Sequence, residues 1–249
     1  MSFSQRRASP ASTATRASMP DWPADGLTPV ERSYLEVISY LASRHGPVIS
    51  AQIARWKRVR PPSVVPVLQR LEQKQLISRT AVGAITLTDT GREIAEWIIR
   101  RHRLLERFLF DVLHVPWHEV HREATLLEPA LSVALEERVV ALVGAATTCP
   151  HGNPIPRRAT APSDDLPLTQ ATPGSWFVIS RIDEEAGEDS CTLQLLWMRG
   201  LIPGTPLVRL ADPTSGVALL RADRSITISR RVAGFIWGHS RVVVPQEGE

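Results

Sequence analysis

The sequence lacks several features that would assign it quickly to a class of protein. Its 249 residues include two cysteines, Cys149 and Cys191, so there is no disulfide framework and a reducing cytoplasm is the expected location. No apolar run approaches the roughly eighteen residues that a membrane-spanning helix needs, so we expect no membrane segment. A nucleophile elbow, a Gly-rich phosphate loop and a His-Glu-x-x-His motif are also missing, which argues against an enzyme.

Positive charge is concentrated in one part of the chain, although the net charge is only +3. Between Ser50 and Arg79 there are seven Lys or Arg residues and a single acid, Glu72, which is a local excess of six positive charges. Such an excess favours an anionic partner. A basic surface that is merely solvated is the plainer interpretation of the same charges.

The N-terminal third predicts an arm followed by a DNA-binding fold. Residues 1–26 are rich in Ser, Ala, Thr, Pro and Arg without apolar periodicity, and we expect a disordered arm. Thr28 and Glu31 then form a capping-box pattern at the start of the first helix. Three short helices precede a hairpin around Gly83. This order predicts a winged helix-turn-helix over 27–92, with its third helix in a major groove of double-stranded DNA.

The predicted third helix has an unusual composition. Pro66 lies about five positions inside it, where it removes a backbone N–H and its ring crowds the carbonyl of Pro62, so the helix is expected to start late or to kink. The predicted DNA-binding residues are Arg55, Lys57, Arg58, Arg60, Ser63, Gln69 and Arg79. Of these, Ser63, Gln69 and Arg60 are the candidates for base reading, and the arginines and lysine of the preceding helix are candidates for phosphate contacts.

The middle of the chain predicts two long amphipathic helices, from Arg92 to Leu113 and from His118 to about Val143. Their apolar stripes are too wide for solitary surface helices and need a partner. A second copy of the chain is the simplest partner, and a dimer also fits the binding of two DNA half-sites. We therefore expect a helical dimerisation domain over 93–147.

A proline-rich segment and a set of strands complete the chain. Six prolines between 148 and 174 predict an extended linker. From residue 175 onward, apolar stretches separated by Gly and Pro turns, CTLQLLWMRG among them, predict the strands of a small β-barrel over 175–246. The expected fold class is therefore multidomain α+β.

The motifs from about residue 27 to residue 156 resemble a known family. RRHRLLERFLFDVLHVPWHEVHREATLLEPALSVALEERV and CPHGNPIP are similar to the metal-binding and dimerisation region of the diphtheria toxin repressor and manganese transport regulator family. LWMRGLIPG resembles the SH3-like (FeoA-like) domain of ferrous-iron-transport accessory proteins, which also occurs at the end of such repressors. The resemblance implies a homodimeric repressor that binds DNA when loaded with Fe²⁺ or Mn²⁺.

The same resemblance places an ancillary metal site on His102, Glu106 and His121. His102 and Glu106 lie one helical turn apart and point the same way. Imidazole and carboxylate together suit Fe²⁺, Mn²⁺, Co²⁺ or Zn²⁺. In the family the C-terminal domain can complete this site, and Glu188, with Cys191, is the candidate here. A plain ion pair on the surface of a helix is the alternative interpretation of His102 and Glu106.

The family's primary metal site departs from its pattern in this sequence. Ser33, Thr125 and Pro129 stand where the family has ligands, and only Glu128 remains. One carboxylate with two hydroxyls does not replace three or four strong donors. We therefore predict a metal-responsive repressor of metal-homeostasis genes with a partly degraded primary site. A metal-independent or non-DNA-binding dimeric regulator or scaffold, descended from the same family, is the alternative.

Overall fold

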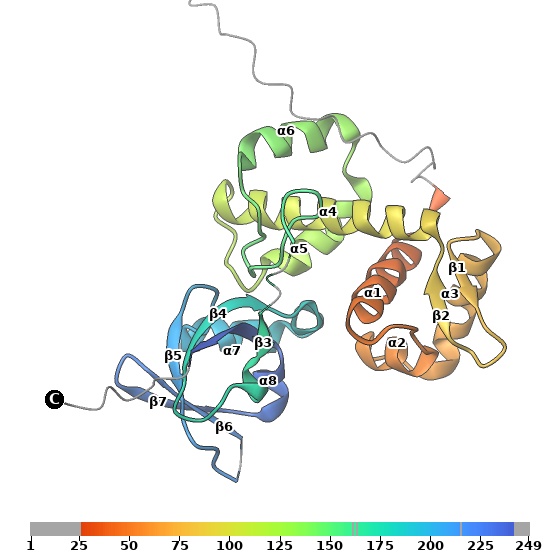
Figure 1. The fold of residues 1–249 in the computed structure, drawn as a ribbon. Helices are drawn as coiled ribbons and strands as arrows, with labels where there is room; N and C mark the ends of the chain where they lie inside the picture. The colour runs from red at the N-terminus through yellow and green to blue at the C-terminus, as the bar shows by residue number, and fades with distance from the viewer. Residues whose placement is uncertain (1–25, 161, 163, 215, 242–249) are drawn as a thin grey trace, which may run out of the picture.

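A computed structural model describes residues 26–160, 162, 164–214 and 216–241 of the chain. Three regions follow one another: a winged helix, a group of helices around the long helix α4, and an antiparallel sheet domain (Figure 1). The predicted multidomain α+β class is confirmed. The arm predicted over 1–26 lies outside the described residues, apart from Gly26 at its end.

The winged helix consists of three helices and a two-stranded hairpin. These elements are α1 (Pro29–His45), α2 (Ser50–Trp56), α3 (Pro61–Gln73), β1 (Ile77–Arg79) and β2 (Ile85–Leu87). The predicted capping box of α1 is confirmed, because Thr28 Oγ1 accepts from the Glu31 N–H at 3.3 Å and the Thr28 N–H donates to Glu31 Oε2 at 2.8 Å. Buried side chains from all five elements form one core.

Helix α3 runs without interruption through its internal proline. It begins at Pro61, so a late start is not what the structure adopts. Pro61 and Pro62 fill the first turn, where backbone amides have no intrahelical partner. Pro66 lies on the exposed face, while the inner face is held by the buried residues Val64, Val67, Leu68 and Leu71. Packing of this inner face offsets the hydrogen bond that Pro66 cannot make.

The central region is built on one long helix. Its elements are α4 (Asp89–Asp111), α5 (Val120–Leu127), the 3-10 turn η2 (Glu128–Ala130) and α6 (Val133–Val143). The single helix predicted from His118 to Val143 is therefore wrong. Pro129 lacks the N–H needed to continue α5, and Ser132 Oγ then accepts from the Leu135 N–H at 3.2 Å to cap a new helix.

The segment predicted as an extended linker over 148–174 is folded against its neighbours in its first part. Its buried residues are Cys149, His151, Asn153 and Ile155. Trp117 Nε1 donates to the Pro150 carbonyl at 2.8 Å, and Asn153 Nδ2 donates to the Ile182 carbonyl at 2.8 Å. These two bonds join the central helices to the sheet domain through this segment. The proline content of the segment did not indicate such contacts.

The C-terminal domain is a six-stranded antiparallel sheet with the strand order β3-β8-β4-β5-β6-β7. Its elements are β3 (Leu166–Pro167), η3 (Leu168–Gln170), β4 (Trp176–Ile182), η4 (Glu184–Glu188), α7 (Ser190–Arg199), β5 (Pro206–Arg209), β6 (Val217–Arg221), β7 (Arg224–Ile228), α8 (Arg230–Gly234) and β8 (Ile236–Arg241). The stretch CTLQLLWMRG forms α7 and not the predicted strand. Leu193 and Leu196 face the core three residues apart, and Gly200 ends the helix in the left-handed conformation.

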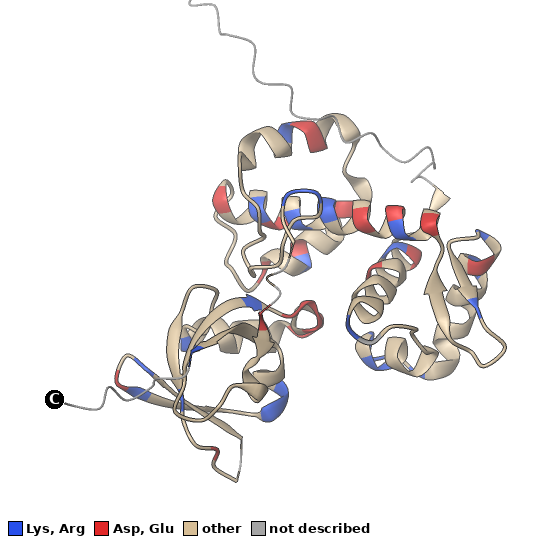
Figure 2. Cartoon of the chain, in the orientation of Figure 1, with Lys and Arg blue, Asp and Glu red and all other residues tan. Residues whose placement is uncertain are grey.

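Charges of opposite sign lie on two facing parts of the molecule. Lys and Arg lie on and after α2, and a run of acids lies on η4 of the sheet domain (Figure 2). Among the described residues, no helix is both long and apolar enough to cross a bilayer.

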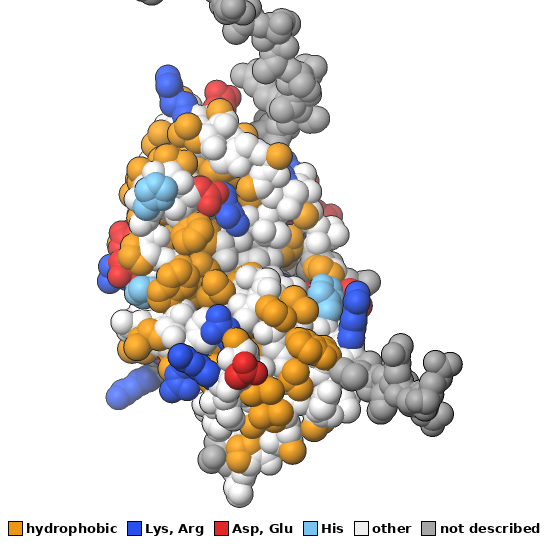
Figure 3. Space-filling view, turned by 90° about the vertical axis from the view of Figure 1, so that its left-hand side faces the viewer, with side chains coloured by type: hydrophobic (Ala, Val, Ile, Leu, Met, Phe, Trp, Pro, Cys, Tyr) orange, Lys and Arg blue, Asp and Glu red, His pale blue; other side chains and the backbone are white. Residues whose placement is uncertain are grey.

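Apolar side chains remain exposed on the central helices. The largest of them on α5 and α6 are Leu126, Leu127, Val133, Leu135 and Leu142. One side of the molecule carries hydrophobic side chains over much of its surface, above both the helical part and the sheet domain (Figure 3). Exposed apolar area of this kind favours association with another surface.

Replacement of Pro66 by Ala is expected to stabilise the winged helix. The substitution restores one helical hydrogen bond at an exposed position. The free energy gained from this bond is larger than the stabilisation that proline provides by restricting the unfolded chain. We expect the free energy of unfolding to rise by about 1–2 kcal/mol in urea denaturation. Val65→Ala, one residue earlier on the exposed face, serves as the control. A loss of stability in the Pro66 variant would show that Pro66 does not destabilise α3.

Candidate metal centre

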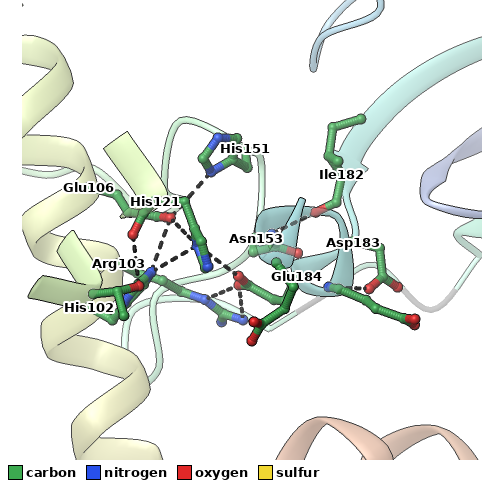
Figure 4. Close-up of polar contacts among 12 residues, drawn as sticks. His102, Arg103, Glu106, His121, His151, Asn153, Ile182, Asp183 and Glu184 are labelled. Atoms are coloured by element: carbon green, nitrogen blue, oxygen red, sulfur yellow. Dashed lines mark hydrogen bonds and ion pairs between the residues drawn. The ribbon is translucent and has the colours of Figure 1, made fainter. Parts of the chain in front are cut away.

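Three side chains from two helices meet between the central helices and the sheet domain (Figure 4). His102 and Glu106 project from consecutive turns of α4, and His121 projects from the first turn of α5. Glu106 Oε1 lies 3.1 Å from His102 Nε2 and 3.0 Å from His121 Nδ1, and the two imidazole nitrogens are 3.1 Å apart. The structure therefore brings together the three residues that the family resemblance placed in the ancillary site.

The donor atoms of this cluster suit a divalent transition metal. Nitrogen and oxygen ligands about 2.1 Å from one ion, at right angles to each other, lie about 3 Å apart, which matches the spacing here. Glu106 is fully buried, and its second oxygen, Oε2, has no hydrogen-bond partner among the described residues. Because a buried carboxylate oxygen without a partner is costly, a cation is the natural complement of this site.

The electrostatics of the cluster are set by one carboxylate among imidazoles. Burial opposes protonation of His102, but the charge and hydrogen bond of Glu106 outweigh it and raise the pKa of His102 to about 9. Burial by itself would raise the pKa of the Glu106 carboxyl, but His151 and His102 hold that pKa well below its usual value. Without a metal, His102 therefore carries a proton at neutral pH.

A second group of ligand types shares Glu106. Cys149 and His151, both buried, supply a thiol and an imidazole within 4.8 Å of the Glu106 carboxylate and of each other. His151 Nε2 donates to the Trp117 carbonyl at 3.1 Å, which leaves Nδ1 facing Glu106 Oε1 at 3.3 Å. Burial, reinforced by the charge of Glu106, raises the pKa of the Cys149 thiol well above its usual value. Both residues lie in the segment predicted as a linker, and neither was among the predicted ligands.

Two glutamates of the sheet domain approach the cluster differently. Glu184 Oε2 lies 4.0 Å from His121 Nδ1, and Arg103 holds its other oxygen at 2.8 and 2.9 Å. The predicted ligand Glu188 lies on the rim of the cavity next to His121, but its carboxylate pairs with Lys57 at 2.5 Å. Cys191, the other candidate, is exposed. The five acids of DEEAGED do not reveal from the sequence which one turns inward.

The predicted ligand Glu128 lies away from this cluster, in an ion-pair network. Arg32 of α1 donates to both of its oxygens, at 2.6 and 2.9 Å, and Arg101 Nε lies 3.5 Å from Oε1. Both arginines also lie over the Trp97 ring. All these side chains are buried, so guanidinium groups surround the one carboxylate that remained from the family's primary site.

The predicted DNA-binding residues lie on the surface of the winged helix. Those exposed are Arg55, Arg58, Arg60, Ser63, Gln69 and Arg79, and Lys57 is half-buried. Arg79 Nε donates to Glu72 at 2.9 Å, which links the hairpin to α3. Lys57 and Arg58 pair with acids of the sheet domain. Ser63 and Gln69 lie on α3 with exposed prolines, so the face offered to bases is small and mostly uncharged.

Comparison with known proteins identifies the family. A family described as "Iron dependent repressor, metal binding and dimerisation domain" matches residues 88–157. The iron-dependent repressor IdeR of Mycobacterium tuberculosis (strain ATCC 25618 / H37Rv) is 30% identical over 232 residues, which are 89% of this chain and 94% of that protein. The chain belongs to the iron-dependent repressor family.

Solved structures of the family agree with this fold. A manganese-dependent transcriptional repressor in complex with manganese is 29% identical, with a TM-score of 0.74 over 85% of this chain and 100% of the other. The IdeR structure from T. acidophilum is 30% identical, with a TM-score of 0.69 over 86% and 99% of the two chains. These relatives are named as repressors and not as enzymes, and their dependence on iron or manganese agrees with the metal classes expected from the sequence.

The matched family region contains the whole cluster. Residues 88–157 include His102, Glu106 and His121 as well as Cys149 and His151. Glu184 lies outside that region, in the sheet domain. The family's metal-binding region thus supplies the buried ligand types, and the sheet domain covers them.

Removal of the Glu128 carboxylate is expected to destabilise the fold without weakening metal binding. Glu128→Ala takes away the charge that neutralises two buried guanidinium groups, and we expect the free energy of unfolding to fall by roughly 3 kcal/mol or more in urea denaturation. Glu137→Ala, an exposed acid on α6, should change it by less than about 0.5 kcal/mol. Loss of Mn²⁺ binding in a folded Glu128→Ala protein would instead make Glu128 a ligand.

Metal affinity is expected to depend on pH through His102. Because its pKa is raised to about 9, a proton must leave Nε2 before that atom can bind a metal at neutral pH. Affinity for Mn²⁺ should therefore rise with pH, by up to about tenfold per unit, and level off near that pKa. Isothermal calorimetry in buffers of different ionisation enthalpy measures both the affinity and the proton released. An affinity that does not change with pH below 9 would contradict the protonated state of His102.

Proposed function

We propose that this protein is a homodimeric transcription repressor of metal-homeostasis genes that binds double-stranded DNA in response to a divalent transition metal. The observation that carries the proposal is the cluster of His102, Glu106 and His121, in which the buried Glu106 Oε2 has no hydrogen-bond partner among the described residues. The cluster lies on α4, the helix that also packs against α1 of the winged helix. A change in this cluster therefore bears on the position of the DNA-binding region.

The donor set supports Fe²⁺ or Mn²⁺ as the ion, and Co²⁺ or Zn²⁺ also match it. Imidazole nitrogen and carboxylate oxygen bind all four, and the affinity of such a site follows the general order of the divalent metals. Iron- and manganese-dependent repressors among the relatives favour the first two in the cell. A bound ion would supply the positive charge that Glu106 otherwise obtains from protonated His102.

The residues of this chain would act by connecting elements. A bound ion would link α4, through His102 and Glu106, to α5, through His121. Glu184 offers a further carboxylate from η4 of the sheet domain. Fixing these elements to one another shifts the population toward one placement of the winged helix. In that state α3 would enter a major groove with Ser63, Gln69 and Arg60 toward the bases. Arg55, Lys57 and Arg58 would face phosphates.

The exposed apolar residues of α5 and α6 support a dimer. Leu126, Leu135 and Leu142 are each about half exposed or more, which is unfavourable unless a second surface covers them. A second copy of the chain places two winged helices on one duplex. The alternative, a metal-independent or non-DNA-binding scaffold, is not favoured by the relatives, which are metal-dependent repressors.

Replacement of His102 by Ala is expected to abolish tight metal binding while the dimer remains. Loss of a direct ligand should lower Mn²⁺ affinity by at least the roughly 10–100-fold seen when a supporting residue is lost. Calorimetry with Mn²⁺ and Co²⁺ measures the affinity, and light scattering measures the mass. His114→Ala, an exposed histidine just after α4, is the control.

Binding to duplex DNA, with and without Mn²⁺, completes this test. Metal-dependent binding by the original protein and its loss in the His102 variant are the expected results. If the variant binds metal as well as the original, the assignment of His102 is wrong. Failure of the original protein to bind DNA at low salt, with or without metal, would favour the scaffold.

A further inference from the structure

A short acidic segment of the sheet domain faces the basic end of the winged helix. The segment 183–189, DEEAGED, has five acids and no Lys or Arg in seven residues. It comprises η4 and the residues on either side of it, and it projects from the sheet domain toward α1 and α2 (Figure 2). We call it the acidic segment.

Three ion pairs join the acidic segment to the winged helix. Lys57 Nζ lies 2.5 Å from Glu188 Oε1, and Arg58 Nη2 lies 3.0 Å from Asp189 Oδ2. Arg44, at the end of α1, forms a third ion pair with Asp183. All three cations belong to the winged helix and all three acids to the acidic segment. The contact is therefore a matched electrostatic interface between two regions of one chain.

Two of these cations occupy the part of a helix-turn-helix that meets the DNA backbone. Lys57 caps the C-terminal end of α2, Arg58 follows it in the turn, and Arg60 is the N-cap of α3. In a helix-turn-helix the first helix crosses the backbone and the N-terminal end of the second enters the groove. Carboxylates that pair with Lys57 and Arg58 thus lie where phosphates of a bound duplex would lie.

Two of the three ion pairs, Lys57–Glu188 and Arg58–Asp189, are accessible enough to exchange. The side chains of Lys57 and Glu188 are 19% and 26% exposed, and those of Arg58 and Asp189 are 43% and 22% exposed. Pairs with this much access to water are weak, because solvent screens them. DNA phosphates, with their high charge density, can therefore displace the carboxylates. The free energy needed to break the ion pairs lowers the affinity for DNA.

We propose that the acidic segment is an intramolecular competitor of DNA: Glu188 and Asp189 occupy Lys57 and Arg58 in place of backbone phosphates and lower the affinity of the protein for duplex DNA. The inference rests on the proposed function and adds a regulatory role for the sheet domain. DNA binding requires Glu188 and Asp189 to separate from Lys57 and Arg58.

The test removes the two negative charges with little change in shape. The double variant Glu188→Gln/Asp189→Asn keeps both side-chain sizes, and Asn at 189 remains a suitable N-cap residue for α7. Fluorescence anisotropy with a labelled mixed-sequence duplex of about 30 base pairs, in saturating Mn²⁺ and low salt, measures DNA affinity. We expect the double variant to bind roughly threefold to tenfold more tightly than the original protein.

Two controls separate competition from a general change of charge. Glu137→Gln/Asp223→Asn removes two exposed acids, one on α6 and one in the turn after β6, and should gain less than twofold. In a Lys57→Ala background, the gain in DNA affinity from Glu188→Gln should disappear, because Glu188 and the DNA phosphates no longer compete for Lys57.

The outcomes distinguish this inference from the proposed function. If the original protein binds DNA and the double variant binds no more tightly, or no more tightly than the charge-matched control, the competition is refuted while the repressor function stands. A gain that persists in full in the Lys57→Ala background also refutes it. If no variant binds duplex DNA at low salt, the proposed function fails, and the competition fails with it.

Discussion

Burial of the Glu106 charge is the constraint on which the centre of this protein depends. A buried carboxylate is tolerated only with cations or hydrogen-bond donors around it, because an isolated charge in the interior costs several kcal/mol. Its partners come from separate parts of the chain: His102 from α4, His121 from α5, and His151 from the segment that precedes the sheet domain. Neutralising one charge therefore determines how these three parts pack together, and it leaves a site with the donor atoms of a metal centre.

The second buried carboxylate, Glu128, has partners of a different chemistry. Imidazoles can lose a proton and bind a metal, whereas a guanidinium keeps its proton at any physiological pH and cannot be a ligand. Arg32 and Arg101 thus make Glu128 part of a permanent link between α1 and η2, while the imidazoles around Glu106 can exchange a proton for an ion. The residues that attach the winged helix to the central region are therefore distinct from those of the candidate metal centre.

The acidic segment connects these two aspects of the molecule. At one end Glu184 and Gly187 approach His121, and a Cβ atom at position 187 would lie 2.4 Å from Cδ2 of the imidazole ring, so any other residue there would displace the ring. At the other end Glu188 and Asp189 pair with the basic end of α2. The acidic segment therefore contacts both the candidate metal centre and the basic end of α2.

Local and periodic features were determined by the sequence itself. The Thr28 capping box, the hairpin around Gly83 and the spacing of His102 and Glu106 each depend on residues a few positions apart, and the sequence predicted all three. What lies far apart in the chain was decided only by the tertiary structure: the pairing of Glu128 with Arg32, 96 residues away, the inward turn of Glu184, and the packing of Cys149 and His151 on Glu106. The physical reason is that a buried charge takes whichever partner the packing of helices and sheet brings within reach, and composition and spacing do not specify that choice.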